Sequence, residues 1–151
     1  MNTYRRLVVA TDFSALGNRA VRVAYVQAWP NESQLVICHA LNEESTQWLL
    51  SHPNPTKRNE VELAHAFMRS LVAPDEQKPG INIVTKVLRG KPADSIIELA
   101  QEVRAELIVA GTHGRDGIER LMLGSVAEAL VRGAPCSVLV VRDSNESMEP
   151  V

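Results

Sequence analysis

Residues 107–126, LIVAGTHGRDGIERLMLGSV, decide how the rest of the chain is interpreted. They open with an apolar run rich in β-branched residues, 107–110, which is too short for a typical helix and predicts a buried strand. Three glycines follow within seven residues, and glycine lets the backbone turn tightly and approach a ligand closely. Ser125 and Glu128 have the spacing of a capping box, which predicts that a helix begins there. A strand, a glycine loop and a helix N-terminus together suit an anion such as phosphate, because the first N–H groups of a helix are unpaired.

The size and composition of the chain narrow the class of protein. With 151 residues, 45% of them hydrophobic and 23% charged, it has the profile of one soluble globular domain, residues 1–151. A net charge of −2 gives no reason to expect nucleic acid or an anionic membrane as a partner. No apolar stretch approaches the roughly 20 residues of a membrane-spanning helix, and the first residues do not form a signal peptide. We therefore expect a cytoplasmic protein with Cys38 and Cys136 as reduced thiols in buried strands.

Apolar runs that predict strands alternate along the chain with amphipathic segments that predict helices. The predicted strands are residues 7–10, 34–40, 81–88, 107–110 and 136–141. The predicted helices are residues 15–29, 59–73, 93–105 and 125–132. We expect a polar loop over residues 43–58 and a flexible tail over residues 143–151. The alternation indicates βαβ units, and therefore a doubly wound α/β fold whose five-stranded parallel sheet has helices on both faces.

Two of the predicted strand ends carry residues suited to binding. Asp12 follows the first strand, and Gly111-Thr-His-Gly-Arg115 follows the fourth. Ligands of open parallel sheets bind beyond the carboxyl ends of the strands, where the strand order reverses. If these two strands are neighbours, the Asp12 carboxylate faces the phosphate donors across one crevice. That arrangement suits a nucleotide whose base and sugar lie near Asp12 and whose phosphates lie near Gly124.

The glycine spacing differs from two common phosphate-binding motifs. Gly111, Gly114 and Gly117 do not have the G-x-G-x-x-G spacing of a Rossmann motif, and Gly124-Ser125 lacks the lysine of a P-loop. The pattern Gly111-x2-Gly114-x9-Gly124-Ser125 instead resembles, at every fixed position, the ATP-binding signature of the universal stress protein family.

This resemblance covers nearly the whole chain. It includes Val8-Val-Ala-Thr-Asp12 with Ser14 at the front and the junction Leu88-Arg-Gly90-Lys-Pro92-Ala93 after the third strand. Residues 43–58 depart most from the family, which varies in that region.

The resemblance implies the strand order 3-2-1-4-5, which places the first and fourth strands side by side. It also implies ATP as ligand, or ADP or AMP, with Mg²⁺ as an optional companion of the phosphates. The adenine is then expected near Asp12 and the backbone around Ala40. The residues to which we assign binding are Thr11, Asp12, Ala40, Ala110, Gly111, His113, Gly114, Arg115, Gly124, Ser125 and Val126. Similar members are usually homodimers, often joined through the fifth strand, with Val138 and Val140 as candidates here. An unpaired edge strand favours such pairing.

Simpler interpretations stand beside these assignments. Asp12 is alternatively a carboxylate that stabilises the start of the first helix, and the glycines alternatively serve a tight turn. His113 is interpreted as a wall of the nucleotide pocket and not as a catalytic base, because no nucleophile with an evident base lies near it in sequence. Arg115 either reaches a phosphate or is a solvated loop residue. We assign no catalytic and no metal-ligating residue.

Three functions compete for this chain. The leading hypothesis is a regulatory nucleotide-binding protein whose occupancy by ATP reports energy or stress. The second is an enzyme that hydrolyses ATP slowly or phosphorylates itself, although such transfer needs a positioned attacking group and Asp12 is the one acid placed for it. The third is an interaction module of the same fold that binds no nucleotide, against which the intact glycines argue.

Overall fold

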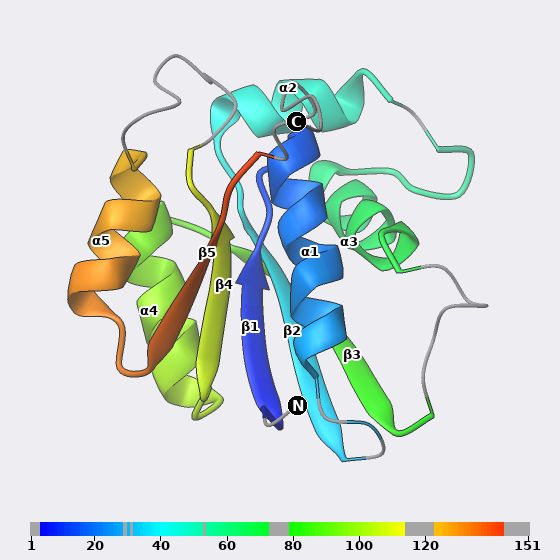
Figure 1. Ribbon diagram of the computed structural model, residues 1–151. Helices are drawn as coiled ribbons and strands as arrows, with labels where there is room; N and C mark the ends of the chain where they lie inside the picture. Colours follow the sequence, from blue (N-terminus) through cyan, green and yellow to red (C-terminus); the bar gives the residue numbers. More distant parts are fainter. Residues whose placement is uncertain are drawn as a thin grey trace, which may run out of the picture.

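Five parallel strands form one sheet with the order β3-β2-β1-β4-β5, as the family resemblance implies (Figure 1). The computed structural model describes residues 4–28, 30, 32–52, 54–72, 79–113 and 123–143. The strands are β1 (Arg6–Ala10), β2 (Ser33–Ala40), β3 (Ile81–Leu88), β4 (Leu107–Gly111) and β5 (Ser137–Val141). The predicted strands are confirmed, and their ends differ from the observed ones by about one residue.

The helices cover both faces of this sheet. They are α1 (Ala15–Gln27), α2 (Glu43–Leu50), α3 (Glu60–Ser70), α4 (Pro92–Glu102) and α5 (Ser125–Gly133). Helices α1, α2 and α3 pack on one face, and α4 and α5 pack on the other (Figure 1). In β1, Leu7 and Val9 belong to the core on the α1 side and Val8 to the core on the α4 side. All three side chains have no exposed surface, as expected for a central strand covered on both faces.

Strand β1 lies between β2 and β4 in the sheet. Val9 pairs with Ile37 of β2 on one side and with Val109 of β4 on the other. Because neighbouring parallel strands end at the same edge of a sheet, the turn after β1 lies beside the turn after β4. The strands β1 and β4 are therefore adjacent, as one binding crevice shared by their two turns requires.

The prediction of a polar loop over residues 43–58 is wrong, because Glu43–Leu50 form helix α2. Asn42 caps this helix: its side chain accepts from the N–H of Ser45, at 2.8 Å, and Ser45 Oγ accepts from the N–H of Asn42, at 3.0 Å. Only Ser45 and Leu49 of α2 are buried. A helix with so narrow a buried face has no apolar stripe that a sequence pattern could detect.

The start of α5 also differs from the prediction. Gly124 is the N-cap, with φ −63° and ψ 161°, and Ser125 is the first helical residue. No side chain caps this helix end in the part of the chain that the structure describes, so Ser125 and Glu128 do not form a capping box. Glu128 pairs instead with Arg132, at 2.9 Å, one helical turn away.

Three other helices end earlier than predicted. Helix α1 ends at Gln27 and not at residue 29, and α3 ends at Ser70 and not at residue 73. Helix α4 ends at Glu102 and not at residue 105, because Arg104 takes a left-handed backbone with φ 54°.

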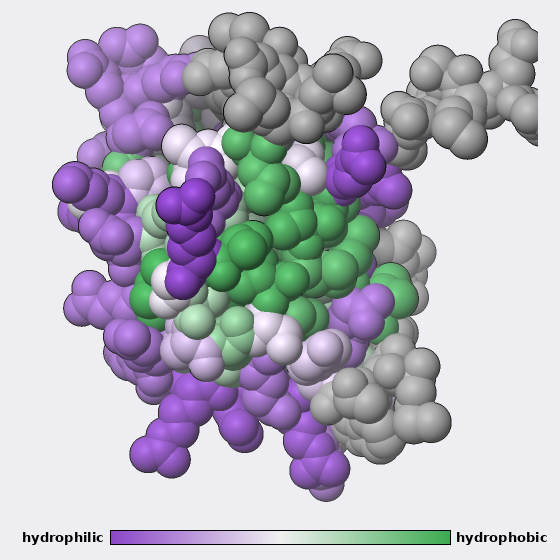
Figure 2. Space-filling view, turned by 60° about the vertical axis from the view of Figure 1, so that its left-hand side comes forward, coloured by the Kyte–Doolittle hydropathy of each residue, from purple (hydrophilic) through white to green (hydrophobic). Residues whose placement is uncertain are grey.

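The sheet has two edge strands, β3 and β5. On β5, the side chains of Val138, Leu139 and Val140 are only half-buried. A broad hydrophobic area covers the side of the molecule that turns forward in Figure 2. The edge at β5 is thus apolar and accessible.

Both cysteines are free thiols, as expected from the sequence. Cys38 is buried in β2, but Cys136 precedes β5 and is half-buried, so the expected buried strand position is wrong for Cys136. Burial raises the pKa of Cys38 to about 12, and burial also raises the pKa of Cys136. Within the described ranges, the structure contains no helix with the length and apolar character needed to cross a membrane.

Candidate functional site

The turn between β1 and α1 holds Asp12 through short-range hydrogen bonds. Asp12 Oδ1 accepts from the backbone N–H of Ser14, at 3.0 Å, and also from the Ser14 hydroxyl. Ser14 Oγ in turn accepts from the N–H of Gly17, at 3.1 Å, and so caps α1. Asp12 therefore supports the start of α1, as its simpler interpretation expects. Its half-buried side chain also lies at the carboxyl edge of the sheet.

Gly17 lets this turn lie directly against the first turn of α1. A Cβ on Gly17 would come within 2.7 Å of Asp12 Oδ1 and 2.8 Å of Thr11 Oγ1. Thr11 Oγ1 already accepts from the N–H of Phe13, at 3.0 Å, and donates to Asn18 Oδ1, at 2.9 Å. Sequence reasoning missed Gly17. A glycine in the first turn of a helix, where its low helix propensity is unfavourable, is the signal that could have found it.

Phe13, the residue after Asp12, has a left-handed backbone with φ 66°. Side chains other than glycine rarely adopt this conformation, which costs about 1–2 kcal/mol. The Phe13 ring is 4% exposed and stacks on His39, with ring centroids 4.2 Å apart, and on Trp48, at 5.5 Å. Aromatic pairs contribute about 0.5–1.5 kcal/mol beyond their burial. The packing of the ring therefore offsets the strain of the backbone.

The end of β2 is joined to the same turn. His39 Nδ1 lies 2.8 Å from the carbonyl oxygen of Thr11, and the N–H of Thr11 donates to the carbonyl of Cys38, at 3.0 Å. Ala40, which follows His39, is half-buried. Thr11, Asp12 and Ala40, the residues predicted to receive the nucleoside, therefore come together from β1 and β2.

The turn after β4 is fixed to the end of β5. The N–H of Thr112 donates to the carbonyl of Val141, at 2.9 Å. His113 Nε2 lies 3.3 Å from Asp143 Oδ2, and His113 Nδ1 lies 3.0 Å from Thr112 Oγ1. Because a carboxylate only accepts, Nε2 carries a hydrogen in its contact with Asp143. The His113 ring is thereby held at the β4–β5 end of the edge.

Two glycines allow close approach around this turn. A Cβ on Gly111 would lie 3.0 Å from Leu16 Cγ, at the start of α1. A Cβ on Gly124 would lie 3.0 Å from His113 Cα, and the N–H of Gly124 donates to the carbonyl of Thr112, at 2.5 Å. The beginning of α5 therefore packs on the residues that follow β4. The end of β4 also contacts the start of α1.

The N-terminus of α5 is a feature of this edge that suits an anion. Ser125 is exposed at the first helical position, and in the described residues no side chain caps the helix. The first N–H groups of an uncapped helix carry a partial positive charge and lack intrahelical partners. This helix start is chemically suited to hold phosphate oxygens.

The structure brings both predicted halves of the site to one edge of the sheet. The first half comprises Thr11, Asp12 and Ala40, and the second comprises Ala110, Gly111, His113, Gly124, Ser125 and Val126. Ala110 is only 4% exposed, so it offers its backbone and not its side chain. Gly114 and Arg115 lie outside the described residues.

Aromatic residues beside the site were missed by sequence reasoning. Phe13 and Trp48 contact each other there, yet neither belongs to a recognisable motif. Within the described ranges, no group of three or more His, Cys, Asp or Glu side chains is placed to hold a metal ion.

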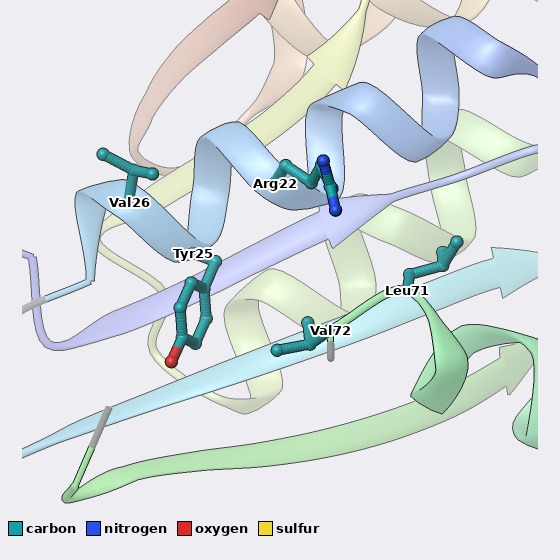
Figure 3. A pocket seen from close by; sticks show the side chains of 5 residues that line it. All are labelled: Arg22, Tyr25, Val26, Leu71 and Val72. Atoms are coloured by element: carbon teal, nitrogen blue, oxygen red, sulfur yellow. The ribbon is translucent and has the colours of Figure 1, made fainter. Parts of the chain in front are cut away.

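A pocket of about 190 Å³ lies away from this edge (Figure 3). It lies between the C-terminal half of α1 and the residues that follow α3, and contains none of the predicted site residues. Its lining residues are Arg22, Tyr25, Val26, Leu71 and Val72.

Comparisons with known proteins agree on one family. The sequence profile described as the universal stress protein family matches residues 3–142. A universal stress protein of Methanocaldococcus jannaschii is 32% identical over 143 residues, which cover 93% of this chain and 84% of that protein.

Solved structures show the same fold. A universal stress protein in complex with cAMP is 29% identical, with a TM-score of 0.60, over 92% of this chain and 97% of that one. A universal stress protein from Archaeoglobus fulgidus in complex with dAMP is 22% identical, with a TM-score of 0.63, over 94% of this chain and all of that one (100%).

Proposed function

Because the chain belongs to the universal stress protein family, we propose that it is an ATP-binding regulatory protein whose nucleotide occupancy reports energy or stress in the cytoplasm. The nucleoside lies at the turn after β1 and the phosphates lie at the start of α5. ADP and AMP compete for the same site with fewer phosphate contacts.

The uncapped start of α5 beside the turn after β4 is the observation that carries this proposal. The N–H of Gly124 is bonded to Thr112, so the backbone N–H groups from Ser125 onward, in the first turn of α5, are the donors at the carboxyl edge of the sheet, where ligands of parallel sheets bind. Gly124 fits against His113 and Thr112 only because it has no side chain. A triphosphate uses such amides without any lysine, because the helix dipole and the N–H groups supply the positive potential.

The nucleoside end is supported by the position of Asp12 beside the end of β2. A carboxylate there accepts a hydrogen bond from a ribose hydroxyl or from the adenine amine. Leu16 links the turns after β1 and β4. It lies in the first turn of α1, directly after the Asp12 turn, and packs against Gly111 at the end of β4. One ligand spanning both turns therefore needs no rearrangement of the strands.

Related proteins support an adenine nucleotide as the ligand class. The relative in complex with cAMP and the Archaeoglobus fulgidus protein in complex with dAMP each hold an adenine nucleotide. We extend this to ATP here because the glycine spacing resembles the ATP-binding signature of the family.

The contacts of Asp12 and His113 favour a regulatory role over rapid hydrolysis of ATP. Asp12 Oδ1 accepts two hydrogen bonds from Ser14, and His113 is held between Thr112 and Asp143. A general base must be in hydrogen-bonding reach of the proton that it removes. Asp12 lies at the nucleoside end of the proposed ligand and not at its phosphates, and both ring nitrogens of His113 already have partners.

Isothermal titration of nucleotide-stripped protein with ATP, ADP and AMP, with and without Mg²⁺, tests the proposal. We expect Gly124→Val to weaken ATP binding at least about a hundredfold, because the new side chain covers the helix start. Its Cβ also crowds the backbone of His113, so the free energy of unfolding should fall by about 1–3 kcal/mol.

The matched control is Gly133→Val, at the opposite end of the same helix. There the added Cβ meets only the flexible end of Ile97, at 3.0 Å, and ATP affinity should stay within about twofold of wild type. Equal ATP affinity in wild type and Gly124→Val would remove the phosphate site from α5.

A further inference from the structure

The turn that carries Asp12 depends on a residue in an unfavourable conformation. Phe13 follows Asp12 directly and has φ 66°, a region that favours glycine. Such a conformation persists only where surrounding contacts impose it. Whatever holds Phe13 therefore also sets the direction in which the backbone leaves Asp12.

Four rings from four segments form what we call the Phe13 cluster: Phe13, His39, Trp48 and Phe67. His39 of β2 and Trp48 of α2 stack on Phe13, with interplanar angles of 29° and 18°. Phe67 of α3 meets Phe13 edge-on, with ring centroids 4.9 Å apart, and meets Trp48 in the same way, at 5.2 Å. The rings thus fix one another as well as Phe13.

The cluster holds both neighbours of Asp12. On one side, His39 Nδ1 lies 2.8 Å from the carbonyl of Thr11. On the other side, the N–H of Phe13 donates to Thr11 Oγ1, at 3.0 Å, while its ring is held by the cluster. Asp12 lies between two residues whose positions the aromatic packing determines.

Trp48 is the member of the cluster that α2 supplies. It lies on a short helix of which only Ser45 and Leu49 are buried. Its ring contacts with Phe13 and Phe67 are the aromatic link between α2 and the site. Burial alone does not require a ring stacked parallel to Phe13 at this position. The stacking geometry points to a role in shaping the turn.

We propose that Trp48 is a positioning residue for the nucleotide site. Its indole holds Phe13 in the left-handed conformation and thereby directs Asp12 toward the nucleoside, so α2 is part of the binding machinery. This inference rests on the proposed function, because it assigns Asp12 to the nucleoside end of a bound adenine nucleotide.

Titration of ATP into Trp48→Ala, Trp48→Phe and Leu50→Ala tests the proposal. Trp48→Ala should weaken ATP binding about tenfold, and Trp48→Phe, which keeps a ring for stacking, should stay within about twofold. Leu50 lies on the same helix and is 52% exposed, so Leu50→Ala should bind as wild type. If Trp48→Ala does not fold, Trp48→Leu replaces it, because leucine retains apolar volume without a ring. Trp48→Leu should likewise weaken ATP binding about tenfold.

A double-mutant cycle with Asp12→Asn separates positioning from general packing. If Trp48 acts through Asp12, its replacement in the Asp12→Asn background should weaken ATP binding only about twofold, because coupled residues are not additive. Hydrogen exchange at the Phe13 amide should also accelerate in Trp48→Ala, while amides in the middle of α1 keep their rates. Additive losses, or an unchanged Phe13 amide, would overturn the positioning role.

The outcomes distinguish this inference from the proposed function. Wild-type protein that binds no adenine nucleotide overturns both. Wild-type protein that binds ATP while Trp48→Ala and Trp48→Leu bind it equally well overturns the role of Trp48 alone.

Discussion

Asp12 combines an observed structural role with the binding role that we propose for it. Its Oδ1 is tied to Ser14, which caps α1, and Gly17 leaves room for this contact. The bonds to Ser14 fix the side chain before a ligand arrives, and a preorganised acceptor spends less of its binding free energy on becoming ordered. The simpler interpretation of Asp12 and the functional one are therefore compatible.

Asp12→Asn should weaken ATP binding about tenfold while leaving the turn intact. The asparagine oxygen still accepts from Ser14, but the charge is lost, and a hydrogen bond to a charged group contributes about 1.5–3 kcal/mol against about 1 kcal/mol for a neutral one. Titration calorimetry measures the change, with Asp94→Asn as the control. Asp94 is an exposed acid in the first turn of α4, so its variant should bind as wild type. Unchanged affinity in Asp12→Asn would place the nucleoside elsewhere.

Sequence patterns could predict which residue types meet at the site but not their backbone conformations. Asp12 and Gly111 were identified because they lie at strand ends, and Gly124 because the glycine spacing resembles the family signature. The left-handed φ of Phe13 has no sequence signal, since phenylalanine is not a residue that favours it. The ring contacts that compensate it come from β2, α2 and α3, which are distant in sequence.

Among the elements, the strands were predicted well and helix α2 was missed, for one physical reason. Central strands covered on both faces are continuous apolar runs, and Leu35, Val36 and Ile37 of β2 are all at most 2% exposed. Helix α2 buries one serine and one leucine, so its formation depends on the cap at Asn42 and on contacts made by Trp48. Capping residues are weaker signals than periodic burial.

Asn42→Ala should loosen α2 without disturbing the sheet. Loss of the side-chain bond to Ser45 costs about 1 kcal/mol, which lowers Tm by about 2–4 °C in a protein of this size. Hydrogen exchange should accelerate at the α2 amides and stay slow in β1. Asn82→Ala is the control, because Asn82 is exposed on the edge strand β3. If both variants lower Tm equally, the cap does not stabilise α2.

For the whole molecule, the two-faced core leaves the apolar edge strand β5 accessible. Helices α1 to α3 and helices α4 and α5 cover the faces of the sheet, whereas β5 pairs on one side only. Unpaired edge strands with apolar side chains pair readily with another strand. We therefore expect β5 to join a second copy of the chain, in keeping with the hydrophobic surface seen in Figure 2.

Val140→Lys should convert this dimer into a monomer. Val138 and Leu139 pack against the two core clusters, so Val140, also half-exposed on β5, is the better place for a charge that blocks edge pairing. Light scattering coupled to size exclusion should give twice the 16.6 kDa chain mass for wild type and a single chain mass for the variant. Val131→Lys is the matched control, because Val131 is 52% exposed on α5 and should leave the mass of the dimer unchanged. A wild type that elutes with the mass of one chain, or a Val140→Lys variant that stays dimeric, would show that β5 is not the interface.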